Sequence, residues 1–302
     1  MPRWITRSLM TVSATLLLAL VAHARPGPNQ PMDDRITHRQ DLAYRFETLD
    51  MPAADGQRHY RLWIATPNHP APAAGFPVVY LLDGNAALGG LSTELLQELE
   101  RGYSPVLVAV GYATQDRIDR ANRTLDYTPR RGDGAQLDPL TGERSGGADA
   151  FLDLLESRIQ PAVAQRVAID RTRQTLWGHS YGGLLVLHAL LTRPHSFQNY
   201  AAASPSLWWG QGRVFEEQAG FEQRLGHHHA SLLLMRGELE PAAPPMVKLR
   251  PQPADQAARR LLHSLQNVPQ LHSQYRTFPG LGHGPMLEAS LRYTLRWLNQ
   301  TH

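Results

Sequence analysis

The sequence predicts an α/β fold with a mostly parallel central sheet, helices on both sides, and antiparallel strands at the N-terminal end. Continuous apolar runs, such as residues 76–82 and 106–110, are typical of strands buried on both faces. They alternate along the chain with longer helical segments, an order that favours parallel pairing. The 302 residues are enough for one large core, and the chain has no cysteine, so disulfides are excluded.

The first 24 residues have the pattern of a secretory signal. Arg3 and Arg7 precede an apolar run over residues 9–22, and Ala22 and Ala24 form an A-x-A cleavage site. An uncleaved membrane anchor is the alternative, but the apolar run is short for a spanning helix. We therefore expect export to the periplasm and a mature chain of residues 25–302, with no stable membrane anchor after cleavage.

The charge balance argues against a nucleic-acid partner. Removing Arg3 and Arg7 from the 30 basic residues leaves 28 against 27 acidic residues. A protein so close to neutral lacks the basic excess that phosphate backbones require.

The first half of the chain predicts the edge and the start of the sheet. Residues 44–49 and 60–66 read as two strands joined by a polar turn at 54–57. The buried strand over residues 76–82 follows, then a helix over residues 91–99 and the buried strand over 106–110.

Residues 117–147 interrupt this alternation. They are polar and rich in Arg, Asp and Gly, which predicts a long functional or disordered loop. The alternation then resumes with an amphipathic helix over residues 151–163. The remaining elements are strands at residues 175–177, 200–203, 231–235 and 274–278, and helices at residues 184–191, 254–265 and 286–298.

Gly178, Ser180 and Gly182 form a G-x-S-x-G motif between a short strand and an apolar helix. Such a turn presents a serine at a strained tip, where larger side chains on either flank would clash. The helix behind Ser180 points its positive end toward the place where an oxyanion forms. The motif is short enough to arise by chance, but its strand–turn–helix context favours a nucleophile.

A serine nucleophile needs a base, and His283 is the candidate. It lies in a glycine-flanked loop between the last strand and the last helix, so the order Ser, acid, His of α/β-hydrolases is possible. Glu240, just after the strand at 231–235, is the candidate acid. Glu238 is the alternative, and a Ser–His dyad without an acid is also possible.

An oxyanion hole needs two backbone donors. The N–H of Tyr181, directly after the nucleophile, is the first candidate. The second is expected from Asn85 or Gly84, after the strand at 76–82, although Asp83-Gly84-Asn85 is also a common turn sequence.

Two further sets of residues are candidates for substrate binding. Trp208 and Trp209 are adjacent on irregular backbone, so at least one is expected to line a pocket. Arg130 and Arg131, with Arg117, Arg120 and Arg123, could form an anion-binding rim, or could pair with the interleaved aspartates. The three successive histidines before residue 230 lack neighbouring ligands at metal spacing, so no metal site is predicted.

With these residues collected, the chain resembles the esterase branch of the α/β-hydrolases. Within that branch it is similar to periplasmic esterases that cleave trilactone catecholate siderophores such as enterobactin and salmochelin. The segments that carry the resemblance are residues 80–86 (YLLDGNA), 123–129 (RTLDYTP), 146–152 (GGADAFL), 178–184 (GHSYGGL), 204–209 (SPSLWW) and 282–284 (GHG).

The resemblance implies a serine esterase that linearises a ferric siderophore to release iron. It implies catalytic roles for Ser180 and His283 and an oxyanion donor at Asn85. It also implies no cofactor, with iron present only as part of the substrate. Two alternatives remain: an esterase for another acyl group (feruloyl, acetyl or S-formylglutathione-like), and a non-catalytic ferric-siderophore binding protein. The strained serine and its base argue against the second.

Overall fold

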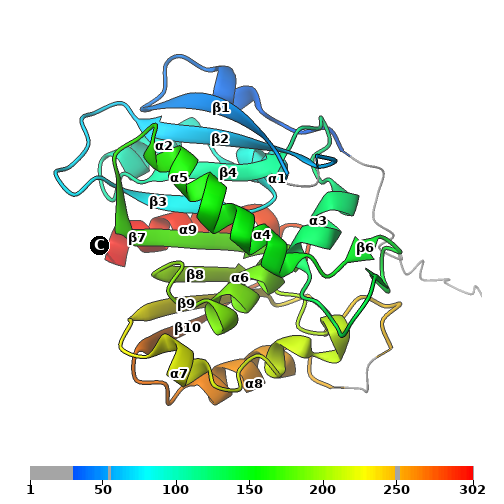
Figure 1. Ribbon diagram of the computed structural model, residues 1–302. Coiled ribbons are helices and arrows are strands. Elements are labelled where there is room, and N and C mark those ends of the chain that lie inside the picture. Colours follow the sequence, from blue (N-terminus) through cyan, green and yellow to red (C-terminus); the bar gives the residue numbers. More distant parts are fainter. Residues whose placement is uncertain (1–29, 54–55, 249–251, 302) are drawn as a thin grey trace, which may run out of the picture.

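The computed structural model describes residues 30–53, 56–248 and 252–301, so the predicted signal sequence, residues 1–24, lies outside the described part. One eight-stranded sheet runs through this part in the order β1-β2-β4-β3-β7-β8-β9-β10 (Figure 1). Its strands are β1 (Tyr44–Pro52), β2 (His59–Pro67), β3 (Phe76–Leu81), β4 (Val106–Tyr112), β7 (Ile169–His179), β8 (Asn199–Ala203), β9 (Ala230–Gly237) and β10 (Leu271–Phe278).

The pairing confirms the predicted mixed sheet. β1 pairs antiparallel with β2, and β2 pairs antiparallel with β4. All other neighbours in the sheet are parallel. Every residue of β3 and of β4 is buried, as their continuous apolar sequences require, because helices cover both faces. β1 and β10 form the two edges.

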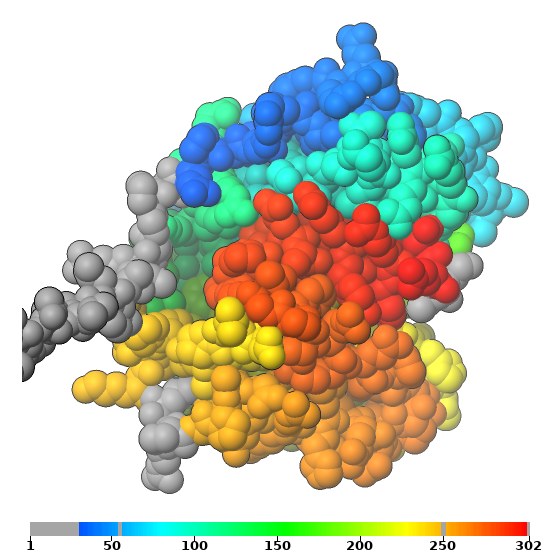
Figure 2. Space-filling view, turned by 180° about the vertical axis from the view of Figure 1, so that it is seen from behind, coloured from blue at the N-terminus to red at the C-terminus, as the bar shows by residue number. Residues whose placement is uncertain are grey.

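Helices enclose the sheet from two sides and produce two apolar cores. Alternate residues of each strand supply the two cores, as the pleat dictates: Leu62 and Ile64 face one, and Trp63 and Ala65 the other. The first face carries α4 (Ala148–Leu154), the π-helical turn η3 (Leu155–Ile159), α5 (Gln160–Ala164), α6 (Tyr181–Thr192), α7 (Phe221–Leu225) and α8 (Gln256–Leu265). The second carries η1 (Arg35–His38), α1 (Gly84–Ala87), η2 (Leu88–Gly90), α2 (Thr93–Glu100) and α9 (Met286–Thr301), of which α9 is the red band in Figure 2.

The stretch over residues 117–147, predicted as a long functional or disordered loop, has regular secondary structure. It contains a helix, α3 (Arg120–Tyr127), and a short antiparallel hairpin of β5 (Gln136–Leu137) and β6 (Arg144–Ser145), both on the right of Figure 1. The Asp119 side chain caps α3 by accepting the N–H of Asn122 at 3.1 Å.

The helix α3 escapes prediction because hydrogen bonds, rather than an apolar stripe, fix it to the core. Its Asp126 is fully buried and accepts the hydroxyls of Tyr60 at 2.9 Å and Tyr112 at 3.0 Å, and it pairs with Arg58. Burial raises the pKa of this carboxyl to about 6, although its partners oppose the rise. A polar segment thus packs like a core element.

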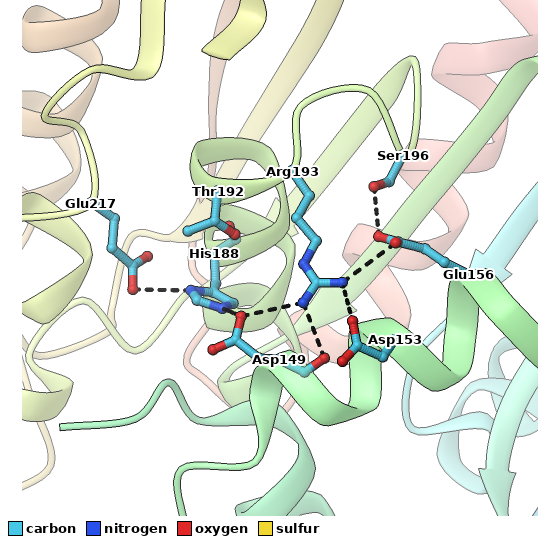
Figure 3. Close-up of polar contacts among 8 residues, drawn as sticks. All are labelled: Asp149, Asp153, Glu156, His188, Thr192, Arg193, Ser196 and Glu217. Atoms are coloured by element: carbon cyan, nitrogen blue, oxygen red, sulfur yellow. Dashed lines mark hydrogen bonds and ion pairs between the residues drawn. The ribbon is translucent and has the colours of Figure 1, made fainter. Parts of the chain in front are cut away.

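An ionic cluster, centred on the buried His188 and extending to the surface, fixes α6, the helix behind Ser180, to its neighbours (Figure 3). His188 on α6 is 2.9 Å from Glu217 and 3.2 Å from Asp149 at the start of α4. Arg193, which directly follows α6, forms ion pairs with Asp149 and Asp153, both on α4. Burial lowers the pKa of His188, but its two carboxylate partners outweigh burial and raise the pKa to about 9. The ring is therefore charged at neutral pH and ties α6 to α4.

Candidate active site

Ser180 occupies the sharp turn that the sequence predicts. It joins β7 to α6 with φ of 63° and ψ of −115°, a region that non-glycine residues rarely adopt. Of the two flanking glycines, Gly178 is required, because a Cβ there would lie 2.5 Å from the backbone of Gly182. The clash expected on the other flank is wrong, because a Cβ on Gly182 would be in ordinary contact, 3.5 Å from the Leu82 side chain. A Cβ on Gly183 would lie 2.6 Å from the Ala203 carbonyl. The local sequence therefore accepts a strained backbone in order to present the Ser180 hydroxyl.

The structure brings Ser180, His283 and Glu240 into one hydrogen-bonded chain. Ser180 Oγ is 3.0 Å from His283 Nε2, and His283 Nδ1 is 2.8 Å from Glu240 Oε2. Because the carboxylate only accepts, Nδ1 carries the proton and Nε2 is left to accept the serine proton. Glu238, the alternative acid, is exposed and accepts the N–H of Gly280 instead.

Glu240 is buried and is held by more than the histidine. Its Oε1 accepts the Ser204 hydroxyl and the Gly237 N–H, both at 2.6 Å. Burial raises the pKa of the carboxyl, but the hydrogen bonds from His283 and Ser204 outweigh burial, so the pKa lies below its usual value. Glu240 is thus ionised and fixed. Ser204 begins the SPSLWW segment, and no local sequence pattern indicates that it holds Glu240.

The predicted oxyanion donors lie at the first turns of two helices. Ala86 and Ala87 both donate to the Asp83 carbonyl, and no backbone acceptor in the described ranges takes the N–H of Gly84 or Asn85. Gly84 is necessary here, because a Cβ would lie 2.7 Å from the backbone of β4. The N–H of Tyr181 is likewise at the open end of α6.

The Asn85 side chain has a separate, structural task. Its Oδ1 accepts the N–H of Tyr112 at 2.9 Å, and its Nδ2 donates to the carbonyls of Tyr112 and Thr114, both at 3.1 Å. Its amide thereby holds the end of β4. Any oxyanion contact by Asn85 must come from its backbone N–H.

Arg123 connects the loop of the oxyanion donors to the nucleophile turn. Its guanidinium donates to both oxygens of Asp83, at 2.7 and 2.9 Å, and to the His179 carbonyl at 3.4 Å. It also lies over the rings of Tyr127 and Tyr181, 5.5 and 5.4 Å from their centroids. Its side chain is 12% exposed. Arg123 is therefore an internal clamp, which corrects its expected place in a surface rim.

Asp83 itself has an unusual backbone that the clamp stabilises. Its φ of 52° and ψ of 49° are left-handed, and its N–H donates to the Tyr127 hydroxyl at 3.1 Å. This conformation turns the chain so that Gly84 and Asn85 begin α1. Asp83 lies in the segment YLLDGNA, and its partners Arg123 and Tyr127 lie in the segment RTLDYTP. The presence of both segments in one chain is the sequence signal for this arrangement.

His179 holds the loop of the candidate base. Its Nε2 donates to the backbone carbonyl of His283 at 2.9 Å, and the two rings are 4.6 Å apart between centroids. Burial and the charge of nearby groups, His283 first, keep the pKa of His179 well below its ordinary value. The ring is therefore a neutral donor that fixes the His283 backbone beside the nucleophile.

The aromatic pair divides into one core and one surface residue. Trp209 is fully buried and donates its indole N–H to Asp138 at 2.7 Å, so its expected contact with substrate is wrong. Asp138 also accepts the Tyr181 hydroxyl at 2.9 Å, which ties the β5–β6 hairpin to the nucleophile turn. Trp208 is partly exposed, and its ring is 6.1 Å from that of Tyr181.

The two arginines predicted to bind substrate lie on exposed backbone next to this hairpin. Arg131 stacks over Trp209, 5.2 Å from its ring. Arg130 donates to the carbonyls of Gly132 and Gly134 within its own loop. In the described ranges no cluster of three or more histidine and acidic side chains has the arrangement of a metal site.

The chain shows clear similarity to known proteins. Residues 54–274 match the family model described as "Putative esterase". The chain is 36% identical to the apo-salmochelin esterase of Escherichia coli, over 93% of this chain and 87% of that protein. It is 31% identical to the ferri-bacillibactin esterase BesA of Bacillus subtilis, over 83% and 88%. A solved structure of the enterobactin hydrolase IroE in complex with DFP is 36% identical, covers 88% of this chain and 99% of that one, and has a TM-score of 0.69.

Proposed function

The chain belongs to the putative esterase family and is a serine ester hydrolase, and from this premise we propose that it hydrolyses the ester bonds of a catecholate siderophore trilactone, releasing iron. The hydrogen-bonded chain Ser180–His283–Glu240 is the observation that carries the proposal. The substrate class follows from relatives that act on salmochelin, bacillibactin and enterobactin.

In the proposed acylation step, Ser180 Oγ attacks the ester carbonyl while His283 Nε2 takes its proton. Glu240 remains ionised, orients the ring and stabilises the imidazolium that forms. The tetrahedral oxyanion is bound by the N–H of Tyr181 and by that of Asn85 or Gly84. The C–O bond then breaks, and the leaving alcohol takes the proton from Nε2.

Deacylation repeats these steps with water. His283 Nε2 removes a proton from water as the water oxygen attacks the acyl-enzyme. The second tetrahedral intermediate collapses, the acid is released, and Ser180 regains its proton. Each cycle therefore adds one water per ester cut, and iron passes through only as part of the substrate.

The test is a product analysis. The protein and its Ser180→Ala variant are incubated separately with ferric and iron-free enterobactin, and mass spectrometry counts the waters added. We expect linear trimers and shorter products with the first protein and intact trilactone with the second. Turnover of p-nitrophenyl, feruloyl or S-formylglutathione esters without trilactone hydrolysis would move the substrate to another acyl ester. No reaction of Ser180 with a fluorophosphonate would instead leave a siderophore-binding protein.

We also propose that the protein acts in the periplasm, because residues 1–24 have the sequence pattern of a secretory signal. No helix in the described ranges combines the length and the apolar composition that a membrane span needs. Expression of the full chain, followed by cell fractionation and N-terminal sequencing of the product, tests this. A mature N-terminus at residue 25 in the periplasmic fraction is the expected result.

A further inference from the structure

A large groove lies beside the candidate active site. It runs between residues 207–215, the loop over residues 242–248, and α8, which is at the lower edge of Figure 1. Its volume is about 1210 Å³. Small-molecule pockets commonly hold about 300–1000 Å³, so the groove has room for an aromatic ring and the linker that carries it.

The walls of the groove are continuous with the catalytic machinery. Trp208 lines the groove and contacts Tyr181, the residue after the nucleophile. Ser206, two residues earlier, donates its N–H to the Ser180 carbonyl at 3.3 Å. On the opposite wall, Ala242 lies two residues after Glu240. The groove therefore borders the turn that carries Ser180 and the loop that follows Glu240, while Ser180, His283 and Glu240 are not themselves among its lining residues.

The lining combines flat apolar surfaces with positive charge. Trp208 and Phe215 supply rings, and Met246, 58% exposed, supplies a flexible thioether at the entrance. Such surfaces bind the face of a planar ring.

The charge of the lining is strongly one-sided. Four arginine and lysine side chains line the groove: Arg131, Lys248, Arg259 and Arg260. Asp255, the one carboxylate among the lining residues, is paired with Arg259 at 2.6 Å. Arg131, Lys248 and Arg260 have no acidic partner among the residues that the structure describes. Arg131 and Arg260 instead stack on aromatic rings, the latter 4.6 Å from the Phe215 centroid.

We propose that this groove is a subsite for an anionic aromatic ring, and that it holds one catecholate arm of the substrate while an ester of the macrocycle lies at Ser180. The inference rests on the proposed function for the identity of the arm. Stacked guanidinium groups keep their outer N–H donors free, so Arg131 and Arg260 can meet the oxygens of a ring that lies against Trp208. A neutral ring would gain only the apolar contacts.

The test uses a pair of probes that share one ring. Isothermal titration measures the binding of 2,3-dihydroxybenzamide to Ser180→Ala protein, which does not turn over. The probe is used as the free ligand, whose ring hydroxyls are neutral, and as its ferric complex, whose ring oxygens are anionic. The double variant Arg131→Gln/Arg260→Gln is expected to raise the Kd of the ferric complex about tenfold and that of the free ligand less than about twofold. The matched control Arg166→Gln/Arg296→Gln removes the same charge far from the groove, where these arginines pair with Glu47 and Glu98, and should change neither Kd.

Several outcomes would overturn the inference. They are equal affinity of the two probes for the unmutated groove, equal Kd values in the groove variant and the control, or no detectable binding of either probe. Thermal melts verify that each variant is folded, and Arg260→Glu, which reverses one charge, provides a second variant with the same predicted direction. Charge-dependent binding without trilactone hydrolysis would overturn the proposed substrate but keep the subsite for an anionic aromatic ring. Trilactone hydrolysis without charge-dependent binding would overturn the subsite but keep the proposed substrate.

Discussion

The Arg123–Asp83 clamp gives a sharp prediction about catalysis. Arg123→Gln removes both hydrogen bonds to Asp83 and the contact with the His179 carbonyl. Asp83 is 4% exposed and left-handed, so its carboxylate then lacks a cation in a buried position. Gly84 and Asn85, the two residues that follow, carry candidate oxyanion donors.

The size of the effect follows from these contacts. Removing one partner of a buried ion pair costs about 3–5 kcal/mol, which gives Asp83 a strong reason to move toward water. Any such movement displaces the donors of Gly84 and Asn85. Since one oxyanion donor contributes about 10²–10³ in kcat, we expect Arg123→Gln to lower kcat about 100-fold.

Steady-state hydrolysis of a p-nitrophenyl ester measures this effect. KM should change less than about threefold, because the donors act on the tetrahedral intermediate more than on the bound ester. The rate of fluorophosphonate labelling should fall in parallel with kcat, because the phosphonyl oxygen occupies the same donors. Adding Asp83→Asn to Arg123→Gln removes the orphan carboxylate and should restore part of the unfolding free energy without restoring kcat.

The chain contains a matched control for this variant. Arg61 makes the same two-pronged contact with Asp50, at 2.6 and 2.8 Å, but on the exposed β1–β2 hairpin. Arg61→Gln should cost less than about 1 kcal/mol of stability and leave kcat unchanged. A link between the clamp and the oxyanion donors would be refuted if Arg123→Gln lost stability while kcat stayed within about threefold of the original.

Three further predictions concern titratable groups near the site. Glu240→Gln should lower kcat about 10²–10⁴-fold, because the amide can no longer fix the His283 tautomer, whereas Glu238→Gln should have little effect; equal losses would contradict the assignment, and ester hydrolysis measures both. His188 has a folded pKa of about 9 against an ordinary 6.5, so its stabilisation is complete below pH 6.5 and is lost as pH rises through 9. The loss amounts to about 3 kcal/mol. In urea titrations from pH 6 to pH 10, the free energy of unfolding should therefore fall with rising pH, and His188→Leu should abolish this fall. The same pH dependence in both proteins would refute the prediction. His179→Leu should lower kcat about tenfold by releasing the His283 backbone, and His179→Gln, which keeps a donor, should recover part of it in the same assay; equal losses in both would show that packing alone matters.

The sequence predicts the sheet and its strand ends well because these depend on local patterns. Buried parallel strands need continuous apolar runs, and β3 and β4 have them. The turn at Ser180 needs glycines where a Cβ would clash, and Gly178 is such a position. The loop of His283 follows the last strand, as expected. The structure brings the ring within 3.0 Å of Ser180 Oγ, and the catalytic roles stay predictions.

What the sequence does not predict are contacts that join distant segments. Glu238 and Glu240 both follow β9 and look equivalent, and only the fold turns the second toward His283. Arg123 looks like its exposed neighbours, yet it pairs with Asp83, which is 40 residues earlier. Trp208 and Trp209 cannot be told apart from the sequence, but only the Trp209 indole is buried and donates its N–H to Asp138. These differences arise from tertiary partners, which composition and periodicity do not encode.

The position of β10 at the edge of the sheet has a consequence for how activity is lost. Ser180 follows β7, a central strand with neighbours on both sides, whereas His283 follows β10, which is hydrogen-bonded only to β9. Opening of an edge strand costs less free energy than global unfolding, so amide hydrogens of β10 should exchange faster than those of β7. During such an opening the nucleophile keeps its strained turn while its base swings away. On heating, the hydrolytic activity should therefore be lost at a temperature a few degrees below the Tm of the fold.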